Sequence, residues 1–288
     1  MKNKVSIKEK FTHRTNFPIK RVIKGQQTTD GAGVSLKRLI ATSEVDNIDP
    51  FFLLDEFRSD NPNDYIAGFP MHPHRGIETI TYLLEGSFRH KDSRGGGGLL
   101  KSGDVQWMTA GKGIQHEEMP VLEEGRLWGY QLWLNLPKKS KWAEPKYQHL
   151  TKDNIPTIFD DGTEIRIISG SFDDNYGPAQ NIVPAEFYDV YLPKGKTLVL
   201  QANKNYNSLI YIHSGSVKIQ GQEIENGNLV EFEENNSITI VSSTEETGFL
   251  FLSAIPNNEP YSRGGPFVMN TRVEILEAFE DYKTGKLF

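Results

Sequence analysis

Apolar and polar residues alternate with a period of two along several short stretches of the chain, a pattern typical of half-buried β-strands. In segment 128–135, four apolar residues that begin with Trp128 fall on one face, and Gln131 and Trp133 fall on the other. Segment 77–84 is β-branched and aromatic, and Gly86 follows it. Short strands separated by Gly, Asn, Asp and Pro favour a β-barrel or sandwich, so we predict an all-β fold.

A helical spacing of apolar residues is clear only near the C-terminus. Within segment 271–282, Ile275, Ala278, Phe279 and Tyr282 recur at intervals that place them on one helical face. Gly285 is a suitable end. We therefore predict one short C-terminal helix whose apolar face carries these four side chains.

Two parts of the chain resemble each other. Segments 80–88 and 209–217 each read as an apolar strand, a Gly-Ser turn and a second apolar strand. A second turn follows at a similar offset, at 101–105 and at 225–229. The simplest interpretation is two related barrels divided near residue 140. We predict domains at 1–140 and 141–288.

Composition excludes several classes of function. The chain has 288 residues, enough for two ordinary domains, and a formal net charge of −6, which argues against a protein that binds the phosphate backbone. We expect no direct contact with nucleic acid. The longest basic run, 137–141, is short, and we interpret it as a solvated linker.

The chain contains no cysteine, which excludes disulfides, cysteine nucleophiles and iron–sulfur clusters. Basic residues at 1–6 are not followed by an apolar stretch, so we predict no secretory signal. No window approaches eighteen consecutive apolar residues, and we expect no membrane span. A cytoplasmic location is our expectation.

Two pairs of residues carry the chemistry that the sequence suggests. His72 and His74 are spaced i, i+2, and so are His116 and Glu118. Side chains two apart on a strand point to the same face, so each pair can aim two ligands at one point. Imidazole and carboxylate without thiolate suit a first-row divalent metal such as iron, manganese, nickel, copper or zinc. If the two strands face each other inside a barrel, they form a three-histidine, one-carboxylate site.

The predicted repeat also limits where this site occurs. Counting from the matching turns aligns His72 with Gln201 and His116 with Ile240. The second half therefore lacks the ligand types, and we expect its barrel to hold no such metal.

Three motifs resemble the pirin family of the cupin superfamily: FPMHPHRGIET at 69–79, GDVQWMTAGKGIQHEEMP at 103–120, and GPFVMNT at 265–271. The resemblance implies a bicupin, two antiparallel β-barrels (double-stranded β-helices), with a metal only in the N-terminal one. It carries the family's ligands onto His72, His74, His116 and Glu118. Fe(II) is our first expectation for the metal, and Mn, Ni, Cu or Zn are alternatives.

Pirin-like proteins include quercetin 2,3-dioxygenases, which cleave the central ring of a flavonol with O₂ and release carbon monoxide. The resemblance thus implies a dioxygenase with a small aromatic substrate. Our hypothesis is that Glu118 also detaches from the metal and acts as a base. The alternatives are a metal- or redox-responsive adaptor that binds a transcription or metabolic protein, and a metal-bound scaffold without turnover. We expect a monomer.

The sequence does not decide the roles of two further residues. Glu78 lies four residues after His74, so a regular strand would place it on the same face and make it a rival carboxylate. His90 lies across the Gly86 turn, where it is either an ordinary histidine or a support for the metal ligands.

Overall fold

The computed structural model describes residues 19–121, 125–233 and 237–288. These residues form two compact units, and each unit is assembled from separate segments. We call them the N-terminal barrel (Gln26–Asn154, Ala179–Val183 and Asn257–Phe288) and the C-terminal barrel (the described part of Met1–Gly25, Ile155–Pro178 and Pro184–Pro256). The division of the chain at residue 140 stays a prediction, and the segment at 1–6, for which we predict no secretory signal, lies outside the described residues.

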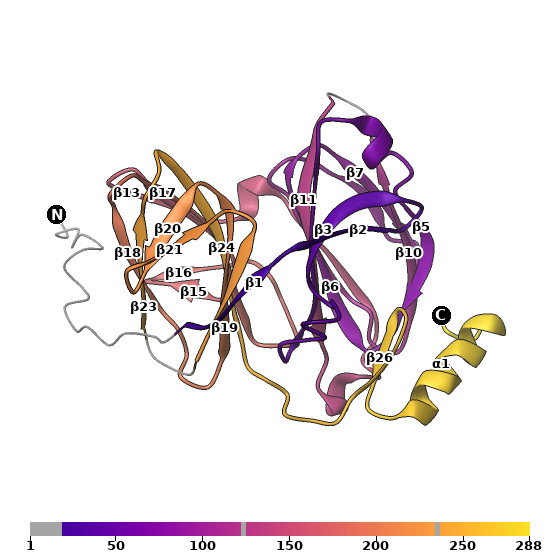
Figure 1. Ribbon diagram of the computed structural model, residues 1–288. Helices are drawn as coiled ribbons and strands as arrows, with labels where there is room; N and C mark the ends of the chain where they lie inside the picture. Colours follow the sequence, from indigo (N-terminus) through magenta and orange to yellow (C-terminus); the bar gives the residue numbers. More distant parts are fainter. Residues whose placement is uncertain (1–18, 122–124, 234–236) are drawn as a thin grey trace. The chain divides into compact units, whose positions relative to one another are not determined.

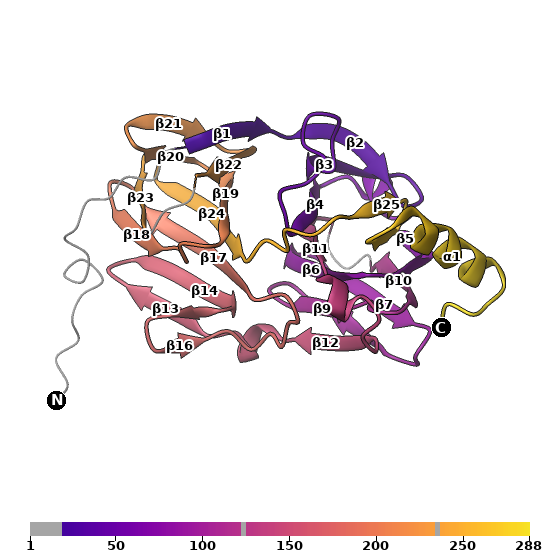
Figure 2. The ribbon, with the colours of Figure 1, turned by 90° about the horizontal axis from the view of Figure 1, so that it is seen from below.

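Two antiparallel sheets build the N-terminal barrel (Figures 1 and 2). The seven-stranded sheet has the order β12-β9-β6-β11-β4-β3-β2, with strands β2 (Gln26–Asp30), β3 (Val34–Ile40), β4 (Phe51–Ser59), β6 (Ile77–Glu85), β9 (Val105–Thr109), β11 (Leu127–Asn135) and β12 (Lys146–Leu150). The four-stranded sheet has the order β5-β10-β7-β8, with strands β5 (Phe69–His74), β7 (Phe88–Asp92), β8 (Gly97–Leu100) and β10 (Ile114–Pro120). Among the described residues, three short 3₁₀ helices lie in the connections: η2 (Pro62–Asp64), η3 (Lys138–Ser140) and η4 (Lys152–Asn154).

The C-terminal barrel repeats this arrangement. Its seven-stranded sheet has the order β1-β22-β19-β24-β17-β14-β13, with strands β1 (Ile19–Lys24), β13 (Thr157–Asp160), β14 (Thr163–Ser169), β17 (Ala185–Pro193), β19 (Asn207–Ser214), β22 (Asn228–Phe232) and β24 (Glu246–Ala254). Its four-stranded sheet has the order β18-β23-β20-β21, with strands β18 (Thr197–Gln201), β20 (Ser216–Ile219), β21 (Gln222–Glu225) and β23 (Ser237–Ser242). A small hairpin pairs β15 (Ser171–Phe172) with β16 (Asn175–Tyr176).

The two strand orders correspond element by element, and the prediction of an all-β protein with two barrels is confirmed. The repeated turns occupy equivalent places. Gly86 follows β6 and Gly215 follows β19, and both have positive φ, as do Gly103 and Gly227 in the second pair of turns. A positive φ strains any residue with a Cβ, so glycine marks the same turn in each barrel.

Aliphatic side chains fill the C-terminal barrel. Its core cluster draws on both sheets and includes Leu198, Leu200, Ile238 and Ile240, each at most 1% exposed. Opposite Ile240 in the strand ladder lies Leu198 rather than Gln201, so counting from the turns does not give two residues that pair as His72 and His116 do. Leu198 and Ile240 are both apolar and offer no metal ligand.

The C-terminal segment belongs to the N-terminal barrel. It forms a hairpin of β25 (Ser262–Gly264) and β26 (Phe267–Met269), followed by the helix α1 (Arg272–Lys283), drawn in yellow in Figure 1. Thr271 caps the helix, and its hydroxyl accepts from Glu274 N. The predicted helix is present, but only part of its predicted apolar face is covered. Ile275 and Ala278 are buried, whereas Phe279 and Tyr282 are 44% and 38% exposed.

The interpretation of the basic run at 137–141 as a solvated linker is wrong for one residue. Lys138 and Lys139 are exposed, but Lys141 is fully buried. Its ammonium group donates to Gly76 O at 2.8 Å, to Val268 O at 2.7 Å and to Asn135 Oδ1. Because an ammonium group has three donors, this triple contact satisfies it and ties β26 to the residue that separates β5 from β6.

Within the parts of the chain that the structure describes, no helix combines the length and the apolar composition that crossing a bilayer requires.

Candidate metal centre

The two predicted ligand pairs lie on neighbouring strands of one sheet. His72 and His74 are on β5, His116 and Glu118 are on β10, and the strands pair antiparallel with His116 opposite His72. Burial alternates along β10, with His116 and Glu118 both on the buried face. A register shift places Glu118 opposite Phe69, and the extra residue lies on β5, because β10 stays in regular register with β7.

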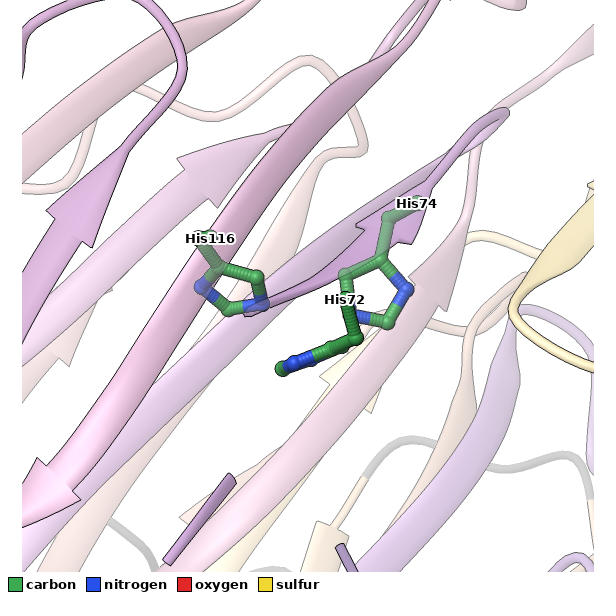
Figure 3. Close-up of side chains that lie close together, drawn as sticks. All are labelled: His72, His74 and His116. Atoms are coloured by element: carbon green, nitrogen blue, oxygen red, sulfur yellow. The ribbon is translucent and has the colours of Figure 1, made fainter. Parts of the chain in front are cut away.

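The three histidine rings converge (Figure 3). Ring centroids lie 4.4 Å apart for His72 and His116, 4.8 Å for His72 and His74, and 5.1 Å for His74 and His116. One nitrogen from each ring lies within 4.8 Å of the others, which is the spacing of a potential metal site. Glu118 is not a member of this cluster.

Hydrogen bonds orient two of the three rings. His72 Nδ1 lies 2.8 Å from Pro70 O, and His74 Nδ1 lies 3.2 Å from Pro266 O. Since a carbonyl only accepts, each Nδ1 carries the proton and each Nε2 keeps its lone pair for a metal. His116 is fully buried, and neither of its ring nitrogens has a hydrogen-bond partner among the described residues. A buried imidazole without a partner is unfavourable, and a metal ion would supply one.

Burial also keeps these histidines neutral. It lowers the pKa of His72, and it holds the pKa of His74 and of His116 well below the usual value, with the neighbouring histidines adding to the effect. The neutral imidazole is the form that binds a metal. The donor set, its tautomers and its charge state therefore fit a divalent transition metal.

Glu118 is 3% exposed and accepts two hydrogen bonds. Its Oε1 accepts from Thr81 Oγ1 at 2.5 Å and from Gln106 Nε2 at 3.0 Å, while Oε2 has no partner among the described residues. Burial raises the pKa of Glu118 to about 7, and the two hydrogen bonds oppose that rise. A cation bound nearby would stabilise the carboxylate form.

Glu78, the rival carboxylate, has a different environment. It is fully buried and accepts from Thr109 Oγ1 at 2.8 Å and from Ile182 N and Val183 N at 3.2 Å each. Gly76, with φ +80°, separates β5 from β6 and breaks the strand that would have kept Glu78 on the face of His74. Glu78 therefore holds segment 179–183 against the barrel.

His90 lies beside the cluster, and its neighbours were not identified from the sequence. Its ring is 5.4 Å from that of His116 and stacks on Tyr147 at 4.4 Å, and its Nε2 lies 3.2 Å from Asp92 Oδ2. The i, i+2 spacing of His90 and Asp92 was an available signal. Tyr147 offered none, because it reaches the site from β12, in a segment without a motif.

A cavity of about 550 Å³ opens beside the histidines. His72, His74 and Glu118 line it together with Gln131 and Trp133 of β11, and Arg263 and Pro266 line it from the C-terminal hairpin. Trp133 packs edge-on against His74, with ring centroids 5.0 Å apart. The volume is within the range of sites for small organic ligands.

The C-terminal hairpin supports the ligand strand directly. Besides the Pro266 contact to His74, Val268 N donates to Arg75 O at 3.1 Å, and the Arg75 side chain pairs with Asp281 of α1 at 2.9 Å. A Cβ at Gly76 would overlap Val268 O, which shows how closely β26 approaches. The orientation of His74 thus depends on residues far along the chain.

Two family models match the chain. The model described as Pirin matches residues 33–134, and the model described as Pirin C-terminal cupin domain matches residues 187–288.

Relatives of this chain extend over most of its length. A Pseudomonas aeruginosa protein whose name marks it provisionally as a quercetin 2,3-dioxygenase is 42% identical over 274 residues, which cover 91% of this chain and 95% of that protein. Human Pirin is 38% identical over 267 residues, with coverages of 91% and 90%. A crystal structure of a quercetin 2,3-dioxygenase from Acinetobacter baumannii superposes with a TM-score of 0.88 at 34% identity, covering 95% of this chain and 99% of that one.

Proposed function

The chain belongs to the pirin family, and on this basis we propose that it is a metal-dependent dioxygenase that cleaves flavonols such as quercetin with O₂. The observation that carries the proposal is the convergence of His72, His74 and His116 beside a cavity large enough for an aromatic molecule. Relatives named for quercetin cleavage support the choice of substrate.

The proposed metal shell is His72, His74, His116 and Glu118, with Fe(II) as the metal and Mn, Ni, Cu or Zn as alternatives. The orphaned nitrogens of His116 and the Nδ1–H tautomers of the other two histidines support the histidine part. Glu118 would join through Oε2. A bound divalent metal would act as a Lewis acid and as a binding point for substrate oxygen and O₂.

The side chains of the cavity have roles of their own. Glu118 would detach from the metal to take the proton of a substrate hydroxyl at Oε2, while Thr81 and Gln106 hold its other oxygen in place. Trp133 supplies a flat apolar wall against which an aromatic ring can stack.

A closed metal site together with a surface patch for a partner would favour the adaptor alternative. The cavity beside the histidines favours the enzyme instead. We also propose that the predicted domain at 1–140 supplies the metal ligands, that the predicted domain at 141–288 lacks them, and that the protein is a cytoplasmic monomer.

Metal content and turnover should be measured on the same preparations. The purified chain is reconstituted separately with Fe(II), Mn(II), Ni(II) and Cu(II), bound metal is quantified, and quercetin loss is followed under O₂. We expect about one metal per chain and turnover that His74→Ala abolishes. The control is His149→Gln, which alters a histidine that pairs with Asp104 away from the cluster. Metal binding without turnover would favour the adaptor, and no metal under any condition would refute the proposed centre.

A further inference from the structure

Two arginines line the cavity beside the histidines, and they differ in their partners. Arg38 forms ion pairs with two carboxylates. Its Nε and Nη2 donate to the two carboxylate oxygens of Asp55 at 2.8 and 2.7 Å, and Nη2 also donates to Asp30 at 2.5 Å. The two carboxylates balance the charge of Arg38, so it attracts a further anion less strongly than an arginine without a carboxylate partner.

Arg263 has no such partner. Its Nη1 donates to Phe52 O at 3.1 Å, and its guanidinium lies over the Trp133 ring, 5.4 Å from the centroid. It forms no ion pair with a carboxylate among the described residues. Burial lowers the pKa of Arg263, and the more distant charges of Asp46 and Asp55 oppose that effect only in part. A partly buried cation with unused donors favours an anionic partner.

Arg263 lies within reach of an aromatic ligand that contacts the histidines. The Trp133 ring contacts His74 at 5.0 Å and Arg263 at 5.4 Å, so the His74 ring and the guanidinium are at most about 10 Å apart. Both residues line the same cavity. An aromatic molecule stacked along Trp133 could therefore place one oxygen at the histidines and another at Arg263.

We propose that Arg263 is a specificity-determining residue that binds an anionic oxygen substituent of the aromatic substrate in the cavity that it shares with His74. The inference rests on the proposed function, because it assumes that an aromatic substrate occupies this cavity. It narrows the substrate class to aromatic compounds that carry a phenolate or a carboxylate in addition to the oxygens directed at the metal centre.

The test compares two probes of nearly equal size, 3,4-dihydroxybenzoate and its neutral amide, 3,4-dihydroxybenzamide. Their binding to the full chain of known metal content is measured by isothermal titration calorimetry. We expect the carboxylate to bind about tenfold more tightly than the amide, as a charge-assisted pair warrants. Arg263→Gln should remove this preference, and Arg263→Lys should keep part of it. The matched control Arg89→Gln, an exposed arginine outside the cavity, should leave it unchanged.

The outcomes separate the two proposals. If both probes bind the wild-type chain equally, or if Arg263→Gln keeps the preference, the role of Arg263 is refuted while the aromatic site stands. If neither probe binds the wild-type chain, the aromatic site and the inference fall together. Because the wild-type preference is measured before any substitution, a variant that fails to fold does not remove the test.

Discussion

Replacing Gly76 by alanine should destabilise the N-terminal barrel and weaken the metal centre together. Gly76 has φ +80°, and an added Cβ would overlap Val268 O and lie 2.9 Å from Met269 Sδ and 3.0 Å from Lys141 Cδ. The left-handed backbone alone costs an alanine about 1 to 2 kcal/mol. The overlap adds more, because β26 must move away from Gly76.

That movement would break two hydrogen bonds. Val268 O accepts from Lys141 Nζ at 2.7 Å, and Val268 N donates to Arg75 O at 3.1 Å. Each buried group left without a partner costs about 1 to 3 kcal/mol, so losing both Val268 hydrogen bonds should add roughly 2 to 6 kcal/mol to the backbone term. The same movement displaces Pro266, whose carbonyl orients His74.

The matched control is Gly95→Ala. Gly95 has φ +83°, but nothing lies within 4 Å of a Cβ added there. It therefore reports the backbone cost without the overlap. Urea unfolding of both variants gives the two free energies, and chelator competition gives their metal affinities. If Gly76→Ala loses no more stability than Gly95→Ala and binds metal equally well, β26 does not support His74 as described.

Three other predictions concern charge and metal. Lysine titrates near pH 10.5 when unfolded, but burial lowers the pKa of Lys141 to about 7. The unfolded state therefore binds more protons between these values, and the free energy of unfolding should rise with pH there by up to about 1.4 kcal/mol per unit. Urea unfolding at pH 7 and 9 should show this rise in the wild type but not in Lys141→Met, and equal changes in both would contradict it. Glu118→Gln removes the basic oxygen and should lower quercetin turnover by about 100-fold or more, and full turnover would exclude the base role. Removing the metal with a chelator should lower the melting temperature. Adding metal back to a free concentration of 100 times Kd should raise the free energy of unfolding by about 2.7 kcal/mol, and His116→Ala should lose this gain.

The histidine cluster was predictable because it depends on a local rule. The i, i+2 spacing sets which side of a strand each residue faces, and the turns around His72 and His116 limited how the two strands could pair. The ladder with His116 opposite His72 follows that rule. The ligand role of Glu118 stays a prediction, because spacing sets which face of β10 it lies on but not how close its carboxylate comes to the three histidines.

The parts that were missed depend on contacts between distant segments. Lys141 reads as a solvated residue within a basic run, yet its partners Gly76 and Val268 are 65 and 127 residues away. The cavity wall combines β11 with the C-terminal hairpin, so neither its volume nor the place of Arg263 could be derived from local pattern. The exposed Phe279 and Tyr282 show the same limit, since helical spacing identifies a face but not what covers it.

The contact between Pro266 and His74 has a consequence for the order of events during synthesis. The carbonyl that orients His74 lies 192 residues after it. A ribosome therefore releases both ligand strands long before the segment that aligns them, and metal loading at full affinity should await the arrival of the C-terminal hairpin. Stalled or prematurely terminated chains would expose the histidines without the carbonyl that orients His74. The cell would therefore load metal mainly into chains that have been translated past residue 266.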